Sequence, residues 1–435
     1  MLRLAWYGDD FTGASDTLAT LSAAGLDALL FTSVPTSGRL AQVGPLDALG
    51  IAGTARALAP EAMRDELAPV ADCFASLEVP VTHYKCCSTF DSAPHVGNLA
   101  TGLDALRRPT HQSWVPIVGG QPSLGRYCIF GELYASATLG GQVHRIDRHP
   151  TMSRHPVTPM HEADLRLHLA RQGLSRVSSL DVRLLDGASD SVLDGALEDH
   201  LCSEPQAVLF DALREDHLAR IGRLLWQRAC RHPLLALGAS SVAQALLAHW
   251  RQDDGLSGDL RPQVAAAAGP VFLLVGSQSP VTARQMMEGS EGYETLTLPV
   301  EDLVSGDSGL QAWIRRCVAV LAEGRSLLAR TAPAGTDGSP PRAVAEACGR
   351  LLSAVLEQAP HVRRAGVAGG DTSSFALRAL SPWALRWAGT LAPGVPLLRL
   401  HSDNTAMDGL ELMLKGGQMG PSDVFQRLRL GTPGA

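Results

Sequence analysis

The chain has 435 residues, of which 45% are hydrophobic and 19% charged, and it carries a formal net charge of −7 with a pI near 6.0. This length predicts two or three domains, and the acidic balance argues against a surface for nucleic acid or anionic membranes. No uncharged apolar run reaches about 18 residues, so we expect no membrane span, no signal peptide and a cytoplasmic protein. Eight scattered cysteines without a C-x-x-C pair indicate reduced thiols rather than a disulfide framework or a zinc site.

The first thirty residues predict a strand, a polar loop and a helix. Residues 2–7 are mostly apolar and run into two adjacent acids, Asp9 and Asp10. We expect Thr12 to cap the following helix and Gly25 to end it. Adjacent carboxylates repel each other, so their cost is offset only if a cation, a substrate hydroxyl or backbone amides take up the charge. The alternative is that the pair only forms the turn and caps the helix.

Polar residues also follow the next predicted strands. A strand over 49–54 delivers Thr54 and Arg56 to a loop, and a strand over 79–84 runs into the segment 85–92, which holds a lysine, three hydroxyls and an acid. The carboxyl edge of the sheet is where open α/β folds bind ligands. We therefore expect these loops to form a polar site.

The remainder of the first half alternates between strands and helices. Strands are predicted at 113–118 and 126–135, and an irregular basic loop at 142–160, either a lid or a dimer contact. We expect His149 and His155 to pack within this loop rather than bind metal. The β/α alternation from 162 to 251 favours a mainly parallel sheet.

The segment 253–269, rich in Gln, Asp, Gly, Ser, Pro and Ala, predicts a linker to a second domain. A strand over 271–275 precedes Gly276-Ser277-Gln278-Ser279, and a strand ending at Ala368 precedes Gly369-Gly370-Asp371-Thr372 and a helix over 375–380. Such junctions form anion cradles for a nucleotide's phosphates, although each alone is also a common tight connection. The third glycine loop is 415–420. None of the three is a Walker A loop or a dinucleotide fingerprint.

Six co-linear motifs resemble the four-carbon acid sugar kinase family, most closely its 3-oxo-tetronate kinase branch. The motifs are Gly8-Asp9-Asp10-Phe11-Thr12-Gly13-Ala14-Ser15-Asp16, Tyr84-Lys85-Cys86-Cys87-Ser88-Thr89-Phe90-Asp91-Ser92, His155-Pro156-Val157-Thr158-Pro159-Met160, Gly276-Ser277-Gln278-Ser279, Gly369-Gly370-Asp371-Thr372-Ser373 and Ala392-Pro393-Gly394-Val395-Pro396. The family pattern has a cysteine where this chain has Gln278, and K-S-G-N-F-G where this chain has residues 415–420.

The resemblance implies an α/β protein with two domains, each a mainly parallel sheet flanked by helices, and an active site in the cleft between them. The expected domains are an acid-sugar-binding domain over 1–252 and an ATP-binding domain over 270–435. It implies transfer of the γ-phosphoryl group of ATP to the terminal 4-hydroxyl of a four-carbon acid sugar, with Mg²⁺ bound to the ATP, and a homodimer. The preferred acid among 3-oxo-tetronate, threonate and erythronate stays open.

Carried over by position, the resemblance implies two groups of binding residues. The substrate group is Asp9, Asp10, Arg56, Lys85, Cys87, Ser88 and Thr89, and the ATP group is Ser277, Ser279, Gly369, Gly370, Asp371, Thr372 and Gly417.

The predicted catalytic residues are Asp10, Lys85 and Asp91, with no metal bound by protein side chains alone. Asp10 or Asp91 would accept the hydroxyl proton, and their spacing does not choose between them. Arg56 is suited to grip the substrate carboxylate, and Lys85 to neutralise the carboxylate or the phosphoryl oxygens. Both could instead be ordinary ion-pair residues. A nucleotide-dependent oxidoreductase and a non-catalytic sugar-acid sensor are the alternative functions.

Overall fold

The structure, a computed structural model, describes residues 2–107, 113–137, 140–253, 255–256, 263–304, 306–332 and 340–432. The chain divides into two compact units, Met1–Leu260 and Arg261–Ala435. Part of the predicted linker 253–269 lies outside the described residues. In the described ranges, no helix is both long and apolar enough to span a bilayer.

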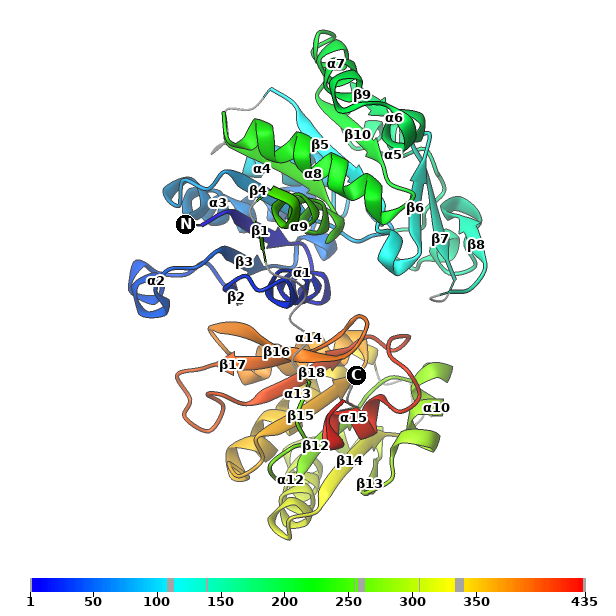
Figure 1. The fold of residues 1–435 in the computed structure, drawn as a ribbon. Coiled ribbons are helices and arrows are strands. Elements are labelled where there is room, and N and C mark those ends of the chain that lie inside the picture. The colour runs from blue at the N-terminus through cyan, green and yellow to red at the C-terminus, as the bar shows by residue number, and fades with distance from the viewer. Residues whose placement is uncertain are drawn as a thin grey trace. The chain divides into compact units, whose positions relative to one another are not determined.

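The first unit is built on a parallel sheet (Figure 1). Its strands are short and almost entirely buried, because helices cover both faces, as is usual for parallel sheets. In spatial order they are β2 (Ala28–Phe31), β3 (Ala48–Ala52), β1 (Leu4–Gly8), β4 (Val81–Lys85), β11 (Leu234–Gly238), β5 (Val115–Gly119), β10 (Ala207–Asp211) and β9 (Val177–Leu180).

Helices that pack on one another flank this sheet. The helices α1 (Phe11–Ala23), α8 (Glu215–Ala229) and α9 (Ser241–Asp253) pack together, and α3 (Pro60–Ser76) packs with α4 (Leu99–Leu106) (Figure 1). The described residues of this unit also form α2 (Ser37–Val43), α5 (Leu165–Ala170), α6 (Val182–Gly187) and α7 (Asp190–Leu201).

A small antiparallel sheet corrects two of the sequence predictions. The single strand predicted over 126–135 is a hairpin of β6 (Arg126–Ile129) and β7 (Glu132–Ser136), because Phe130 and Gly131 both adopt positive φ and reverse the chain. The loop predicted as wholly irregular over 142–160 begins with β8 (Val143–Arg145), which pairs with β7. The three prolines lie beyond β8, so they do not prevent this pairing.

The second unit has a mixed sheet. Its first five strands in spatial order are parallel, and β17 and β16 add an antiparallel extension. The order is β13 (Tyr293–Leu298), β14 (Ser326–Thr331), β12 (Val271–Val275), β15 (Arg364–Ala368), β18 (Glu411–Lys415), β17 (Val395–His401) and β16 (Ala384–Ala392). Its helices are α10 (Pro280–Gly289), α11 (Val300–Val304), α12 (Asp307–Ala322), α13 (Pro341–Gln358), α14 (Gly370–Leu380) and α15 (Val424–Leu430).

Strand register brings the polar loops of each unit together. In the first unit, Gly8 at the end of β1 lies opposite Ala52 of β3 and Lys85 of β4. In the second, Ala368 at the end of β15 lies opposite Val275 of β12 and Lys415 of β18. Each unit therefore gathers three loops at one carboxyl edge, the usual ligand edge of an open α/β sheet.

Candidate functional site

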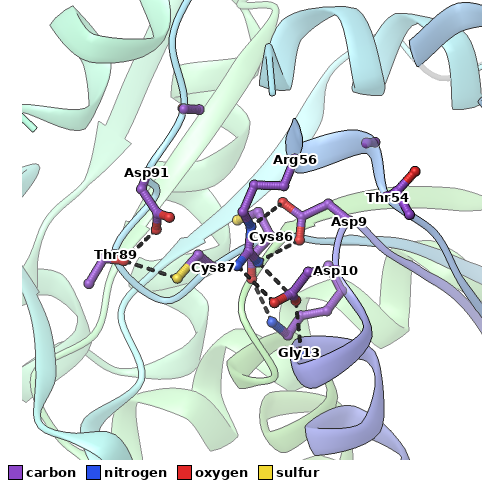
Figure 2. Close-up of polar contacts among 12 residues, drawn as sticks. Asp9, Asp10, Gly13, Thr54, Arg56, Cys86, Cys87, Thr89 and Asp91 are labelled. Atoms are coloured by element: carbon purple, nitrogen blue, oxygen red, sulfur yellow. Dashed lines mark hydrogen bonds and ion pairs between the residues drawn. The ribbon is translucent and has the colours of Figure 1, made fainter. Parts of the chain in front are cut away.

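The two aspartates after β1 are held by one arginine. The Arg56 guanidinium donates to Asp9 through Nη2 at 2.6 Å and Nε at 3.3 Å, and to Asp10 through Nη1 at 2.9 Å and Nη2 at 3.0 Å. Figure 2 shows Arg56 reaching both carboxylates, which leave adjacent positions of the same loop. The repulsion expected for adjacent carboxylates is thus offset by a shared cation.

Asp10 also caps α1, a role that the sequence analysis gave to Thr12. The helix begins at Phe11, one residue before Thr12, and Asp10 Oδ1 accepts a hydrogen bond from the Gly13 amide at 2.8 Å. Aspartate is a strong capping residue because its oxygen satisfies a free amide of the first turn. Asp10 is therefore both a helix cap and a member of an ion pair.

Burial changes the pKa of Asp9 and leaves Asp10 as the more exposed of the two carboxylates. Asp9 is 2% exposed, and burial, with Asp10 beside it, raises the pKa of Asp9 against the opposing effect of Arg56. The two carboxylates outweigh burial and raise the pKa of Arg56. The Asp10 side chain is 30% exposed and so is the more accessible carboxylate.

Lys85 lies beside the same cap. Its Nζ is buried and donates to the Cys86 carbonyl oxygen at 2.7 Å. A methyl group placed on Gly13 would overlap the Lys85 ammonium and would lie 2.6 Å from Asp10 Oδ1. Gly13 thus provides the space in which the ammonium and the Asp10 carboxylate approach each other. We call Asp9, Asp10, Arg56 and Lys85 the ion cluster.

The loop after β4 forms a second polar group. Thr89 Oγ1 donates to Asp91 Oδ1 at 2.5 Å, and Cys87 Sγ lies 3.0 Å from Thr89 Oγ1. Despite burial, Arg56 and hydrogen bonds from Cys87 and Thr89 lower the pKa of Asp91. Burial raises the pKa of Cys87 to about 11, so this thiol is neutral near pH 7. Ser88 is partly buried in the turn closed by the Phe90 amide and the Cys87 carbonyl.

Sequence reasoning missed the residue that fixes the loop of Arg56. Glu66 of α3 accepts hydrogen bonds from the Thr54 amide at 2.7 Å, from Thr54 Oγ1 at 2.6 Å and from the Tyr7 hydroxyl. Its place in an amphipathic helix gave no sign of this contact. Glu66 therefore positions the segment that carries Arg56.

A further missed contact joins three segments far apart in sequence. Ser240 Oγ donates to Asp16 Oδ2 at 2.5 Å, and Gln121 Nε2 lies 3.4 Å from the same oxygen. Asp16 closes the first motif, which could have singled it out, but Gln121 and Ser240 carry no local signal. This group ties α1 to the ends of β5 and β11.

In the second unit, the Gly-Gly-Asp-Thr turn begins a helix. Gly369 has a φ of 133° and precedes α14, which starts at Gly370, five residues earlier than predicted. Asp371 and Thr372 lie in its first turn. A methyl group on Gly370 would meet nothing within 4 Å, so the helix N-terminus is open above this residue. Exposed amides at such an N-terminus favour an anion.

The other two glycine loops contact each other through hydroxyls. Ser279 caps α10, and its Oγ lies 2.5 Å from the Gly417 carbonyl oxygen. Thr282 Oγ1 lies 2.9 Å from the same oxygen and 3.1 Å from Ser277 Oγ. The buried Gln285 amide donates to the carbonyl oxygens of Met419 and Gly420, each at 2.9 Å. These contacts fix the loop after β18 to the loop after β12.

A buried lysine lies under these loops. Lys415, at the end of β18, is 1% exposed, and its Nζ donates to Thr282 Oγ1 at 3.3 Å. Burial lowers the pKa of Lys415 to about 8. Its carbonyl oxygen accepts the Gly369 amide at 2.9 Å, so the residue supports two of the three glycine loops.

Models of known protein families match both parts of the chain. Residues 4–246 match the model of a sugar-binding N-terminal domain, and residues 272–425 that of a nucleotide-binding C-terminal domain. A 3-oxo-isoapionate kinase from Paraburkholderia graminis is 37% identical and is matched over 99% of this chain and 94% of its own length. A 3-oxo-tetronate kinase from Methylobacterium radiotolerans is 29% identical over 98% of both chains.

Solved structures share the fold. A protein from Salmonella typhimurium LT2 superimposes with a TM-score of 0.81 at 23% identity, covering 98% of both chains. A Haemophilus influenzae protein of family DUF1537 gives a TM-score of 0.76 at 21% identity with the same coverage. The α/β architecture predicted from the sequence is confirmed.

Proposed function

Because this chain belongs to the four-carbon acid sugar kinase family, a family of phosphotransferases, we propose that it transfers the γ-phosphoryl group of ATP to the terminal 4-hydroxyl of a 3-oxo sugar acid. The substrate we propose to test first is 3-oxo-isoapionate, since the relative named for it is 37% identical, against 29% for a relative named for 3-oxo-tetronate. Threonate and erythronate test the need for the 3-oxo group.

The residues at the carboxyl edge of the second unit fit a nucleotide. The open helix N-terminus at Gly370 offers backbone amides, and Ser277 and Thr372 add hydroxyls. In this proposal Gly369, Gly370, Asp371 and Thr372 hold the phosphates, with Ser277, Ser279 and Gly417 shaping the facing loop. Magnesium would enter with the nucleotide and neutralise the charge on its phosphates.

The observation that carries the proposal is the Asp10 carboxylate, which Arg56 and the start of α1 hold beside Lys85. Phosphoryl transfer asks an enzyme mainly for positioning and charge neutralisation. We assign Asp10 to orient the substrate hydroxyl and accept its proton, since this carboxylate is 30% exposed and fixed in place. Lys85 would neutralise charge on the transferred group.

Asp91 receives a different role. Its lowered pKa makes it a weaker base, and the Thr89 hydroxyl already donates to it. In this proposal Asp91 orients Thr89, so that Ser88, Thr89 and Cys87 read the hydroxyls of the sugar acid. Arg56 holds Asp9 and Asp10 in place.

The proposal is tested by supplying the purified chain with ATP, Mg²⁺ and each of the four acids. The expected result is release of ADP together with an acid phosphorylated at its terminal hydroxyl, identified by ³¹P and ¹³C spectra. Binding of an acid without consumption of ATP would support a sensor and contradict the proposal. Reduction or oxidation of the acid by a nicotinamide cofactor would support an oxidoreductase instead.

A further inference from the structure

The substrate of the proposed reaction carries a carboxylate, and the ion cluster is poorly suited to receive it. Arg56 already donates four hydrogen bonds to Asp9 and Asp10. A guanidinium has five N–H donors, so about one is left for a ligand. An acid that approached Arg56 would also meet two carboxylates at once.

Lys85 does not supply the missing charge. Its buried ammonium donates to the Cys86 carbonyl oxygen at 2.7 Å and faces the Asp10 cap. Counted as ionised, the carboxylates of Asp9, Asp10 and Asp91 exceed the two cations by one negative charge. A further cation is therefore needed before this edge of the sheet can hold an anionic substrate.

Arg126, the first residue of β6, has the properties of such a cation. It is partly buried, and burial lowers the pKa of its guanidinium. Its backbone pairs with Gln121, directly after the carboxyl end of β5, and the Gln121 side chain reaches Asp16 of α1. Arg126 therefore lies at the same carboxyl edge of the sheet as the ion cluster, beside the end of a different strand.

The hydrogen bonds of Arg126 are incomplete. Its Nη1 donates to the Leu124 carbonyl oxygen, but its buried Nε has no partner, and no ion pair joins it to a carboxylate in the part of the chain that the structure describes. Other arginines of the unit differ: Arg145 pairs with Asp147, Arg166 with Asp164 and Arg183 with Asp181. A desolvated guanidinium without a counter-ion is costly, and a bound anion would offset that cost.

The neighbouring histidine does not compete for the anion. Burial, together with the charges of His144 and Arg126, lowers the pKa of His149, which is therefore neutral near pH 7. His149 Nδ1 accepts the amides of Thr151 at 3.2 Å and Met152 at 3.1 Å. The basic loop thus places a neutral ring, not a second cation, close to Arg126.

We propose that Arg126 binds the carboxylate of the sugar acid and so fixes the substrate with its acid end toward β6 and its terminal hydroxyl toward Asp10. This inference rests on the proposed function and adds the residue that reads the acid group. Arg126 is a binding residue and takes no part in proton transfer. A guanidinium suits this role because its parallel N–H groups match the two oxygens of a carboxylate.

The test measures KM for the acid and for ATP in the full chain carrying Arg126→Gln. The expected result is a rise of about 10- to 100-fold in KM for the acid, as for loss of a charge-assisted contact, with KM for ATP and the melting temperature little changed. Arg126→Lys keeps the charge and should restore part of the affinity. Arg183→Gln, which removes an exposed arginine paired with Asp181, is the matched control and should leave both constants unchanged.

A neutral analogue separates recognition from folding. The analogue replaces the carboxylate of the acid with a hydroxymethyl group, and the wild-type chain should bind it about 10- to 100-fold more weakly than the acid, a preference that Arg126→Gln should lose. An unchanged KM for the acid in Arg126→Gln would overturn the inference while leaving the kinase proposal intact. If Arg126→Gln does not fold, an Arg126→Lys variant with unchanged acid affinity and unchanged preference over the analogue would overturn it. A wild-type chain that phosphorylates none of the acids would instead overturn the proposed function.

Discussion

The carboxyl edges of the two units, which we propose bind anions, are built from different chemical groups. The edge of the first unit uses charged side chains that neutralise one another, as in the bonds from Arg56 to Asp9 and Asp10. The edge of the second unit uses glycine, backbone amides and hydroxyls, and its lysine, Lys415, is buried beneath the loops. In the proposed function, the first edge selects its ligand by charge and hydrogen-bond geometry, whereas the second lets a phosphate chain approach the backbone closely.

This difference determines which substitutions should impair ligand binding or catalysis in each unit. In the first, a change of charge at constant shape should abolish the reaction, because the carboxylates and cations depend on one another. In the second, an added methyl group should suffice, because the amides must be reached at close range.

The largest effect is expected for Asp10→Asn. Asparagine caps helices as well as aspartate does, so α1 should persist, but the proton acceptor and half of the Arg56 pairing are lost. We expect kcat to decline by about 10²- to 10⁴-fold, as for loss of a general base. Asp181→Asn is the matched control, since Asp181 also caps a helix and pairs with an arginine, and its kcat should stay at the wild-type value. Near-normal turnover of Asp10→Asn would remove Asp10 from the site.

Gly13→Ala should have the next largest effect. The added methyl group overlaps the Lys85 ammonium and crowds the Asp10 carboxylate, so both groups must shift. Small displacements of such groups cost up to about 100-fold, and we expect kcat/KM to decline by about 10- to 100-fold. Gly195→Ala provides the control, because this helical glycine has nothing within 4 Å of an added methyl group. It should raise stability by roughly 0.5–1 kcal/mol without loss of activity. Equal activity of the two variants would contradict the close approach of Lys85 and Asp10.

Gly370→Ala tests the second unit without a cost to its fold. Its methyl group would enter open space at the start of α14, where we place the phosphates. Losing one hydrogen bond to a charged group, about 1.5 kcal/mol, corresponds to a rise in KM for ATP of about 10-fold. KM for the acid and the thermal transition should stay as in the wild type. A variant with unchanged KM for ATP would show that the phosphates do not approach this residue.

The smallest effect is expected from Lys415 and appears in stability. Burial lowers its pKa from 10.5 to about 8, so between these values the unfolded chain holds a proton that the folded chain has lost. The free energy of unfolding should therefore rise with pH in this window, by up to about 1.4 kcal/mol per pH unit. The free energy of unfolding would be measured with denaturant at pH 7.5, 9 and 10. It should rise with pH more steeply in the wild type than in Lys415→Met. Identical slopes in both proteins would mean that Lys415 is not desolvated in the folded state.

The sequence was most informative where the candidate site residues are adjacent in the chain. The Asp9-Asp10 pair, the 85–92 segment and the glycine loops each follow an apolar strand, and parallel register then brings them to one edge. The helix beginning at Gly370 was placed too late because Gly-Gly-Asp-Thr has low helix propensity, whereas Gly369 supplies the unusual φ that starts the turn.

Contacts between distant segments could not be read in this way. Glu66 lies in an ordinary helix and Ser240 in the turn between β11 and α9, and their roles arise only when α3 meets the loop after β3 and this turn meets α1. The grip of Arg56 on a substrate carboxylate was expected from residue type alone. The structure gives its donors to Asp9 and Asp10, an arrangement that no local pattern specifies.

Equilibrium binding to two full-length variants tests most directly whether the first unit binds the acid and the second unit binds the nucleotide. Wild-type, Asp10→Asn and Gly370→Ala chains would each be titrated by calorimetry with 3-oxo-isoapionate and, separately, with a non-hydrolysable ATP analogue in Mg²⁺. We predict a crossed result: Gly370→Ala loses affinity for the analogue but keeps that for the acid, and Asp10→Asn keeps affinity for the analogue but not for the acid. Parallel loss of both ligands in either variant, or loss of neither, would contradict the account.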